Sequence, residues 1–222
     1  MIPQRKQDIQ IFLASDIELK QLRASNAEAL FRLSDKNRKH LRRWLPWVDR
    51  TRSVKDSGKF IQESRKRHAE GNGFDLGIWH KEKLIGVIGL HNVSKDSART
   101  EIGYWLSKEM QGKGIMVQSC KALIGYLFDE LNFHRVEIRC ASENEKSCAI
   151  PEKLGFAYEG TLRKTSWLND HYIDLKIYGL LREEWKQKST SNLPGSRAKE
   201  QTSLKRIHDA MQKESSRISK SD

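Results

Sequence analysis

The sequence has few cysteines and no long hydrophobic run, and each shortage excludes a class of protein. Of its 222 residues only three are cysteine, with no C-x-x-C pair and an odd count that disfavours a disulfide framework. The best apolar run, Leu84–Leu90, has the length of a strand, whereas a membrane helix needs about 20 apolar residues. The first residues lack the apolar stretch of a secretory signal. We therefore expect a soluble, cytoplasmic protein that does not act at a membrane.

Several motifs of nucleotide and metal chemistry are also missing. The chain contains neither the G-x-G-x-x-G fingerprint of dinucleotide-binding folds nor the G-x-x-x-x-G-K-S/T loop of P-loop nucleotidases. Its seven histidines show neither H-x-x-x-H nor H-E-x-x-H spacing, so no metal site is expected. Cys148 has no histidine at a motif position to activate it, and we interpret it as an inert buried thiol.

Positive charge is what the sequence has in abundance. Lys and Arg number 41 against 29 Asp and Glu, which gives a net charge of +12. Six tryptophans and seven phenylalanines argue against wholesale disorder, and the length suits one domain with an extension. A charge of this sign favours acidic partners, such as nucleic acid, a nucleotide cofactor or a ribonucleoprotein surface.

Composition divides the chain into three parts. Residues 1–16 are read as an N-terminal extension, 17–185 as the domain, and 186–222 as a basic tail with no aromatic residue. Residues 189–196 have the composition of a linker, and 198–214 can form at most a short polar helix, because they have too little apolar surface to dock. The tail is therefore either a solvated segment or an arm that contacts nucleic acid.

Strand and helix patterns fill residues 17–185. Strand-like segments lie at 17–22, 74–79, 84–90, 99–106, 136–140, 156–161 and 172–180, and helix-like segments at 26–41, 54–69, 114–131 and 145–153. Several consecutive strands precede a strand–helix–strand unit. This order predicts the α/β class. The strands would form a mixed sheet, in an α+β arrangement, with helices on its faces.

The most informative segment joins the 99–106 strand to the helix that begins near Gly114. Its sequence, Gln111-Gly-Lys-Gly-Ile-Met116, puts two glycines at a helix start, where backbone N–H groups lack intrahelical partners and the helix dipole is positive. Small residues there let a phosphate approach, and Lys113 adds positive charge. The pattern alone fits either an anion site or an ordinary turn.

This loop resembles the pyrophosphate-binding Q/R-x-x-G-x-G/A loop of the GNAT acetyltransferase superfamily, with Met116 in place of the final Gly or Ala. Asn144–Ser147, Lys153–Phe156 and Glu159-Gly160 resemble the next block of that superfamily. Three more segments are similar to the RimJ/RimL-type branch, which acetylates N-terminal alanine or serine of ribosomal proteins: Trp44–Trp47, Glu101–Leu106 and Trp167–Asp170. The resemblance covers about residues 17–185, and its motifs follow one another in family order.

The resemblance implies the GNAT acyl-CoA N-acyltransferase fold, a mostly antiparallel sheet splayed between its fourth and fifth strands with helices on both faces. It also implies acetyl-CoA as co-substrate and no metal. The pantetheine arm would lie along the 104–106 strand like an added strand, and the pyrophosphate would rest on residues 112–116. The cofactor-binding residues implied are Tyr104, Trp105, Leu106, Gln111, Gly112, Lys113, Gly114, Ile115, Met116 and Asn144, with Lys153 and Arg135 as weaker candidates for phosphate contacts.

The reaction that the resemblance implies is direct transfer of acetyl from a thioester to an amine in a ternary complex. An α-amino group titrates at about 7.7–8.0 and a lysine amine near 10.4, so an N-terminal acceptor needs less help to lose its proton. A backbone N–H near Trp105 or Leu106 would stabilise the oxyanion. Ser147 would donate a proton or a hydrogen bond to the departing thiolate.

The general base is left open by the sequence. Relatives often carry a glutamate just before the Trp/Tyr-Leu-Asn segment, where this chain has Ser166. Glu101 and Asp75 are two replacements, and water relayed to solvent is a third possibility. Three tryptophans fit either the core or the rim of the acceptor site: Trp44, Trp47 and Trp167.

Three functions follow as hypotheses. The first is acetylation of a protein N-terminus, most simply of a ribosomal protein, by a monomer or homodimer whose basic surface and tail make weak contact with RNA or the ribosome. The second is acetylation of a small amine, a polyamine or an aminoglycoside, although a chain of net charge +12 repels polycations. The third is a non-catalytic module that binds CoA or nucleic acid, which the departures at Met116 and Ser166 keep open.

Overall fold

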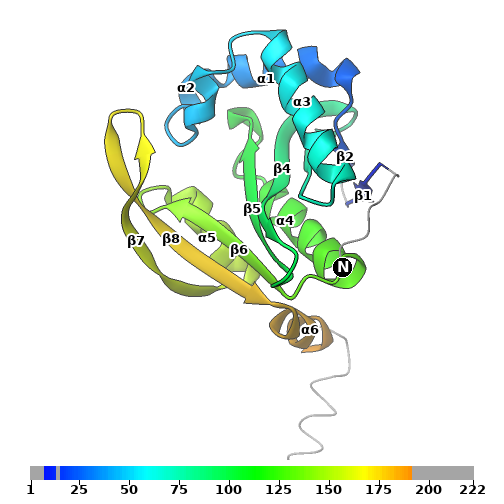
Figure 1. Cartoon of the computed structure of the whole chain (residues 1–222), viewed down its shortest axis with the longest axis vertical. Coiled ribbons are helices and arrows are strands. Elements are labelled where there is room, and N and C mark those ends of the chain that lie inside the picture. Colours follow the sequence, from blue (N-terminus) through cyan, green and yellow to red (C-terminus); the bar gives the residue numbers. More distant parts are fainter. Residues whose placement is uncertain (1–7, 14–15, 192–222) are drawn as a thin grey trace, which may run out of the picture. The chain divides into compact units, whose positions relative to one another are not determined.

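One eight-stranded sheet organises the chain up to Leu181. The computed structural model describes residues 8–13 and 16–191, and the chain divides into two compact units, one ending at Leu181 and one beginning at Arg182. The strands lie in the order β1-β2-β3-β4-β5-β6-β8-β7, and all neighbours are antiparallel except β5 and β6 (Figure 1). Their bounds are β1 Gln10–Phe12, β2 Ile17–Gln21, β3 Asp75–His80, β4 Lys83–Ser94, β5 Arg99–Leu106, β6 Arg135–Ala141, β7 Ala157–Leu168 and β8 His171–Leu181.

Helices connect the strands. The longer ones in the first unit are α1 Ala27–Lys36, α3 Val54–Ala69, α4 Ile115–Gly125 and α5 Glu145–Leu154, with a short α2 at Arg38–Leu41. Single turns are η1 Ala24–Asn26, η2 Pro46–Asp49 and η3 Lys108–Met110, and a π turn, η4 Tyr126–Glu130, extends α4. In the second unit α6 spans Arg182–Ser191. The predicted polar helix at 198–214 and the tail beyond Ser191 lie outside the described residues.

The predicted fold class is confirmed: the sheet is mixed, mostly antiparallel and carries helices on both faces. The predicted 54–69 helix and 99–106 strand coincide with α3 and β5. The predicted 26–41 helix is interrupted at Asn37, whose amide donates to Leu33 O (2.9 Å) while its Oδ1 accepts from the Lys108 N–H (2.9 Å). Within the predicted N-terminal extension, Gln10–Phe12 pairs with β2 and so forms the edge of the sheet.

Side chains of the sheet alternate between two helical layers. On one face Leu30 of α1 and Ile61 of α3 pack with Trp79 and Val87, and Trp105 packs against this cluster. We call this the α1/α3 face. On the other face the Tyr104 hydroxyl donates to the backbone oxygen of residue 147 in α5 (3.2 Å) and interacts electrostatically with Cys120 of α4. We call it the α4/α5 face.

The strands β5 and β6 pair only at one end. Arg99, Thr100 and Glu101 pair with Arg135, Val136 and Glu137, after which the two strands separate (Figure 1). Beyond Glu101, β5 stays paired with β4 as far as Leu106, whereas β6 stays paired with β8. We call the point where they separate the fork. It is the splay predicted between the fourth and fifth strands, renumbered because β1 adds a strand at the edge.

Two neighbouring glycines clear the α1/α3 face beside the fork. Gly89 of β4 and Gly103 of β5 are cross-strand partners. A Cβ atom on Gly89 would lie 2.2 Å from Oδ1 of Asp75, and one on Gly103 would lie 2.7 Å from Nε2 and Cδ2 of His91. The side chains of Asp75 and His91 therefore lie flat across the sheet, each over a residue that has no side chain of its own.

The buried carboxylate of Asp75 fastens α3 to the sheet. Asp75 is 3% exposed and forms an ion pair with Arg67 of α3. The Arg67 guanidinium also donates to Leu90 O (3.0 Å), and the Asp75 N–H donates to Ser64 Oγ (2.8 Å). Removal of one member of such an ion pair destabilises the fold, because the remaining charge has no partner of opposite sign. The carboxylate of Asp75, which the sequence offered as a candidate base, thus forms an ion pair that joins α3 to the sheet.

We predict that Asp75→Asn lowers the free energy of unfolding by about 3 kcal/mol, because Arg67 loses its partner in a low-dielectric setting. Urea unfolding followed by tryptophan fluorescence measures the change. Asp96→Asn, on the exposed turn between β4 and β5, is the matched control and should stay within about 0.5 kcal/mol of wild type. Equal changes for the two variants would contradict the structural role of Asp75.

Candidate active site

The free edge of β5 leads directly into the start of α4. After Leu106 the chain makes the turn η3 and then the loop that begins at Gln111. Gly112 and Gly114 have φ of 75° and 73°, a left-handed conformation that favours glycine. Residues 112–114 are exposed, and Gly114 caps α4 without a side-chain hydrogen bond. The first N–H groups of α4 therefore have no side-chain cap, a geometry compatible with the pyrophosphate site that the family resemblance implied.

The Met116 side chain does not obstruct this loop. Met116 is 8% exposed and Ile115 is 5% exposed, so both side chains point into the core from the first turn of α4. The departure from the family pattern at residue 116 is thus accommodated on the buried side of the helix. The exposed backbone of the loop is unaffected.

Three polar contacts connect the region from the end of α1 to α2 with η3 and with the loop that follows it. Lys36 forms an ion pair with Glu109 (3.2 Å), Asn37 Oδ1 accepts from the Lys108 N–H (2.9 Å), and His40 Nε2 lies 2.7 Å from Gln111 Nε2. The Gln111 amide is the donor in the last contact when His40 is neutral. Sequence analysis missed His40, because the two residues lie 71 positions apart and no local pattern joins them.

Positive charges gather around His40. Burial lowers its pKa, and Lys146, Lys108 and Arg43 lower it further. These cations come from α5, from η3 and from the segment after α2, so three elements direct positive charge towards the same loop. Together with the exposed glycines and the uncapped helix start, they fit a diphosphate, which is the part of acetyl-CoA predicted to bind here.

The α4/α5 face of the fork holds the hydroxyl predicted to act as an acid. Asn144 Oδ1 accepts from the N–H of Ser147 (3.3 Å) and so caps α5. This cap places Ser147 Oγ 3.4 Å from Tyr104 Oη and 3.5 Å from Cys140 Sγ. The structure therefore places Ser147 beside Tyr104 of β5. The Asn144 oxygen serves the helix cap, which positions Ser147.

The groups around Ser147 are held in their neutral forms. Burial raises the pKa of the Tyr104 hydroxyl well above its ordinary value, and the nearby Cys120 and Cys140 raise it further. Burial likewise raises the pKa of the Cys140 thiol to about 12. Cys148 is buried, and its thiol donates to Ala141 O (3.6 Å). At neutral pH the Tyr104 hydroxyl and the Cys140 thiol on this side of the fork are thus protonated.

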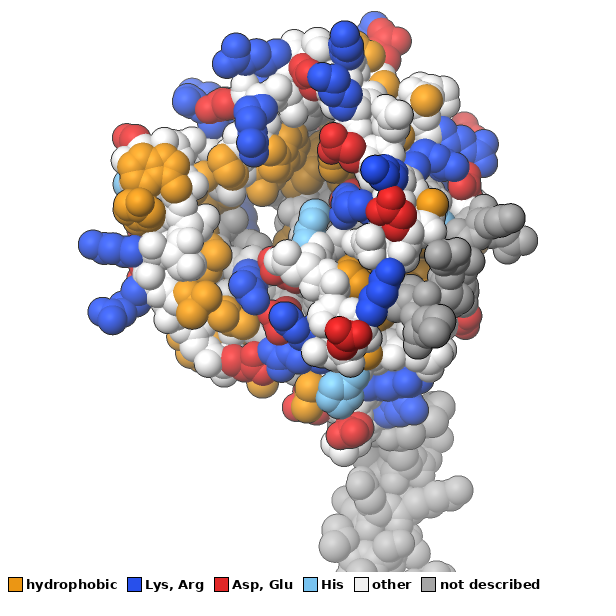
Figure 2. All heavy atoms as spheres, in the orientation of Figure 1, with side chains coloured by type: hydrophobic (Ala, Val, Ile, Leu, Met, Phe, Trp, Pro, Cys, Tyr) orange, Lys and Arg blue, Asp and Glu red, His pale blue; other side chains and the backbone are white. Residues whose placement is uncertain are grey.

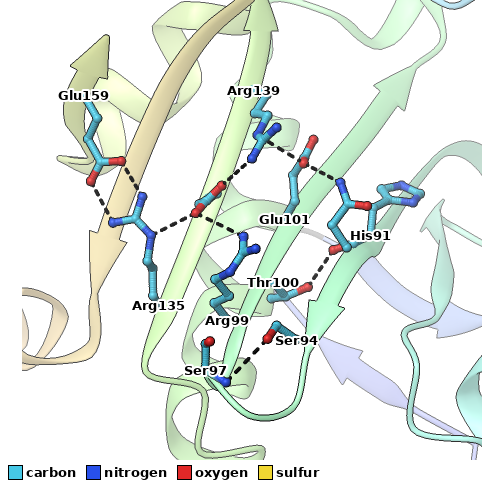
Figure 3. Close-up of polar contacts among 11 residues, drawn as sticks. His91, Ser94, Ser97, Arg99, Thr100, Glu101, Arg135, Arg139 and Glu159 are labelled. Atoms are coloured by element: carbon cyan, nitrogen blue, oxygen red, sulfur yellow. Dashed lines mark hydrogen bonds and ion pairs between the residues drawn. The ribbon is translucent and has the colours of Figure 1, made fainter. Parts of the chain in front are cut away.

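Glu101 is the last residue of β5 that pairs with β6. Its Oε2 accepts from the Asn92 amide (2.9 Å) and faces Arg139 Nε at 3.4 Å (Figure 3). Arg135, a candidate for phosphate contacts, is instead engaged by Glu137 and Glu159. The strand register puts it at the paired end of β5, away from the loop at residues 111–116. Lys153, the other phosphate candidate, is exposed in the last turn of α5.

Aromatic side chains border the open side of the fork. The rings of Trp47 and Trp105 are 5.9 Å apart, and Trp44 is half-buried. On the β7–β8 hairpin, Trp167 is 54% exposed and lies edge-on to Tyr172 at 4.8 Å. Figure 2 shows the surface hollowed between this hairpin and the helices α1 and α2, with hydrophobic side chains along the upper wall.

The hairpin tip meets the segment that follows α2. The Asn169 amide donates to Arg42 O (3.4 Å), a contact between residues 127 positions apart. It joins the two sides of the hollow at one point. Ser166, which stands where relatives carry glutamate, is half-buried on the same hairpin and pairs with Ile173.

Within the described part of the chain, no group of three or more His, Cys, Asp or Glu side chains is arranged to hold a metal ion. No described helix has the length and apolar character needed to cross a bilayer.

Comparison with known proteins identifies close relatives. Residues 16–157 match the family model described as an acetyltransferase (GNAT) domain. The chain is 38% identical over 170 residues to the putative ribosomal N-acetyltransferase YdaF of Bacillus subtilis, covering 76% of this chain and 93% of that protein. It is 31% identical over 168 residues to the ribosomal-protein-serine acetyltransferase of Escherichia coli, covering 76% and 94%.

A solved structure supports the same assignment. RimL, a ribosomal L7/L12 alpha-N-protein acetyltransferase in complex with coenzyme A, superposes with a TM-score of 0.77 at 27% identity, covering 79% of this chain and 99% of that one. The family model spans more than half of the chain, and the sheet has the fork that the family resemblance implied. The chain therefore belongs to the GNAT acetyltransferase family and is an acetyl-CoA-dependent N-acetyltransferase.

Proposed function

We propose that this chain acetylates the N-terminal α-amino group of a protein, and that the natural acceptor is a ribosomal protein. The observation that carries the proposal is the fork, whose free strand edge runs into an uncapped helix start on one side and opens into an aromatic-lined hollow on the other. The names of the relatives in Bacillus subtilis and Escherichia coli support a ribosomal acceptor. Such an acceptor would set the reaction in the cytoplasm.

Acetyl-CoA supplies an acetyl group activated as a thioester. The free edge of β5, formed by Tyr104, Trp105 and Leu106, would bind the pantetheine arm through main-chain hydrogen bonds, as an added strand binds. The loop from Gln111 to Met116 would bind the pyrophosphate through its N–H groups, with Lys113 adding charge. Only the turn η3 separates the two segments, so one short stretch of chain would hold both parts of the cofactor.

Two side chains are proposed to move protons. Ser147 donates a proton to the departing thiolate. The Tyr104 hydroxyl, which stays neutral, positions Ser147 by accepting a hydrogen bond from its Oγ. Glu101, at the fork on the opposite face, is the carboxylate on which deprotonation of the amine depends. A backbone N–H of Trp105 or Leu106 stabilises the oxygen that becomes negative during attack.

The alternative functions have less support. A small polycationic amine is disfavoured by the net charge of +12. A non-catalytic module was suggested partly by Met116, whose buried side chain leaves the loop open. Contact with RNA through the basic surface stays a prediction from charge, and so does the choice between monomer and homodimer.

Acetylation of a peptide tests the proposed function directly. With acetyl-CoA, a peptide beginning with serine or alanine should gain one acetyl group, and CoA thiol should appear in equal amount. Thiol release and intact-mass spectrometry measure the two products. The same peptide with a blocked N-terminus is the control and should not react. Turnover with spermidine but not with the free peptide would contradict the proposal and favour a small-amine acceptor.

Ser147→Ala should lower kcat about 100-fold without weakening CoA binding, because the thiolate then leaves without a proton donor. Steady-state kinetics and calorimetric titration of CoA separate the two effects. Ser97→Ala, on the exposed turn before β5, is the control and should behave as wild type. A kcat for Ser147→Ala within about twofold of wild type would remove Ser147 as the acid.

The pKa of His40 should rise when CoA binds. In the free chain burial and three cations lower this pKa, and a diphosphate bound to the loop would neutralise the cations. Binding should therefore take up protons as the pH falls towards the His40 pKa. Nuclear magnetic resonance titration of the His40 ring, with and without CoA, measures the shift. His134, exposed before β6, should not respond. An unchanged His40 pKa would place the diphosphate elsewhere.

A further inference from the structure

The two faces of the fork differ in what covers them. On the α4/α5 face, Tyr104, Cys140 and Ser147 close it from three elements, with hydrogen bonds of 3.4–3.5 Å between them. If the pantetheine arm runs along β5 from Leu106, its thioester reaches the fork and lies next to Tyr104, Cys140 and Ser147 on the α4/α5 face. An acceptor amine must therefore approach the fork from the α1/α3 face.

On the α1/α3 face, the β5 residue beyond the fork is a glycine and has no side chain of its own. Gly103 is two positions beyond Glu101, so both residues lie on the same face of β5. Gly103 is therefore the first position beyond the fork on the face that the acceptor would approach. The ring of His91, from the neighbouring strand β4, fills the space that a Cβ on Gly103 would need. Its Nε2 lies 2.7 Å from that Cβ position, and the residue is exposed. The imidazole nitrogen thus lies over the first β5 residue beyond the fork on the open side.

The carboxylates on this face already have cationic partners. Glu101 faces Arg139, Asp75 is paired with Arg67, and Glu137 is paired with Arg99, Arg135 and Arg139. By contrast, among the described residues the His91 ring nitrogens have no hydrogen-bond partner. Glu101 would have to exchange its contacts with Asn92 and Arg139 before it accepted a proton from an amine.

His91 and Glu101 are cross-strand partners. Their Cα atoms pair in the register of β4 and β5, and such partners have Cβ atoms about 5 Å apart. Figure 3 shows Glu101 pointing towards Arg139 on one side, with His91 on the adjacent strand on the other. As cross-strand partners, the two side chains lie on the same face of the sheet.

We propose that His91 is the group that takes the proton from the acceptor ammonium, and that Glu101 stabilises the imidazolium that results. This inference deepens the proposed function and rests on it. The ammonium gives one proton to His91 Nε2, and the neutral amine then forms the C–N bond as the C–S bond breaks. The nitrogen loses its second proton to solvent after attack. Ser147 gives its proton to the thiolate and regains one from solvent, so one proton is released in total. Because His91 is exposed, the first proton leaves to solvent.

The pH dependence of kcat/KM for a serine-initiated peptide tests this assignment. His91→Asn should lower kcat/KM about tenfold near pH 6.5 and less than about twofold near pH 9.5, where the α-amino group is already neutral. Glu101→Gln should show a smaller loss in the same direction. The double variant should be no worse than His91→Asn, because Glu101 acts through the imidazole. CoA affinity, measured by calorimetry, should be unchanged in all three variants.

His134→Asn, an exposed histidine outside the fork, is the matched control and should keep the wild-type profile. A loss for His91→Asn that is equal at all pH values, or no loss at all, would overturn the role of His91. Multiplicative losses in the double variant would overturn the coupling to Glu101. These results differ from failure of the proposed function, in which the wild type binds CoA but acetylates no peptide.

Discussion

The early end of pairing between β5 and β6 is the constraint on which the rest of the structure depends. Only three residue pairs join the two strands, and the main-chain groups of β5 beyond Glu101 then lack a strand partner on one side. Backbone N–H and C=O groups seldom stay unsatisfied, so a free edge of this kind favours an extended ligand. The turn η3 joins this edge to the loop before α4, so the two segments that we propose bind the cofactor are close together in the chain.

The fork also gives each face a separate task. The α4/α5 face holds neutral hydroxyls and thiols around Ser147, whereas the α1/α3 face holds charged side chains and the His91 ring. In the proposed mechanism, proton donation to sulfur and proton removal from nitrogen would therefore occur on opposite sides of one sheet. The helix α2 contacts the loop before α4 through His40 and Gln111.

Local patterns predicted most of the fold and part of the site. The 54–69 helix and 99–106 strand carry clear periodicity, and the glycines of the 111–116 loop mark a helix start, so these features were predictable. The β7 strand was predicted too short, because its largely exposed residues from Ala157 to Leu168 show no buried stripe. The contacts of His40 and the placement of His91 depend on pairing between distant segments, which periodicity does not encode.

The contact between Asn169 and Arg42 has a consequence for acceptor choice. It forms a bridge between the β7–β8 hairpin and the segment after α2. A free chain end passes beneath such a bridge more easily than an internal stretch, which must double back to present the same atoms. Under the proposed function, the bridge would therefore favour terminal residues as acceptors.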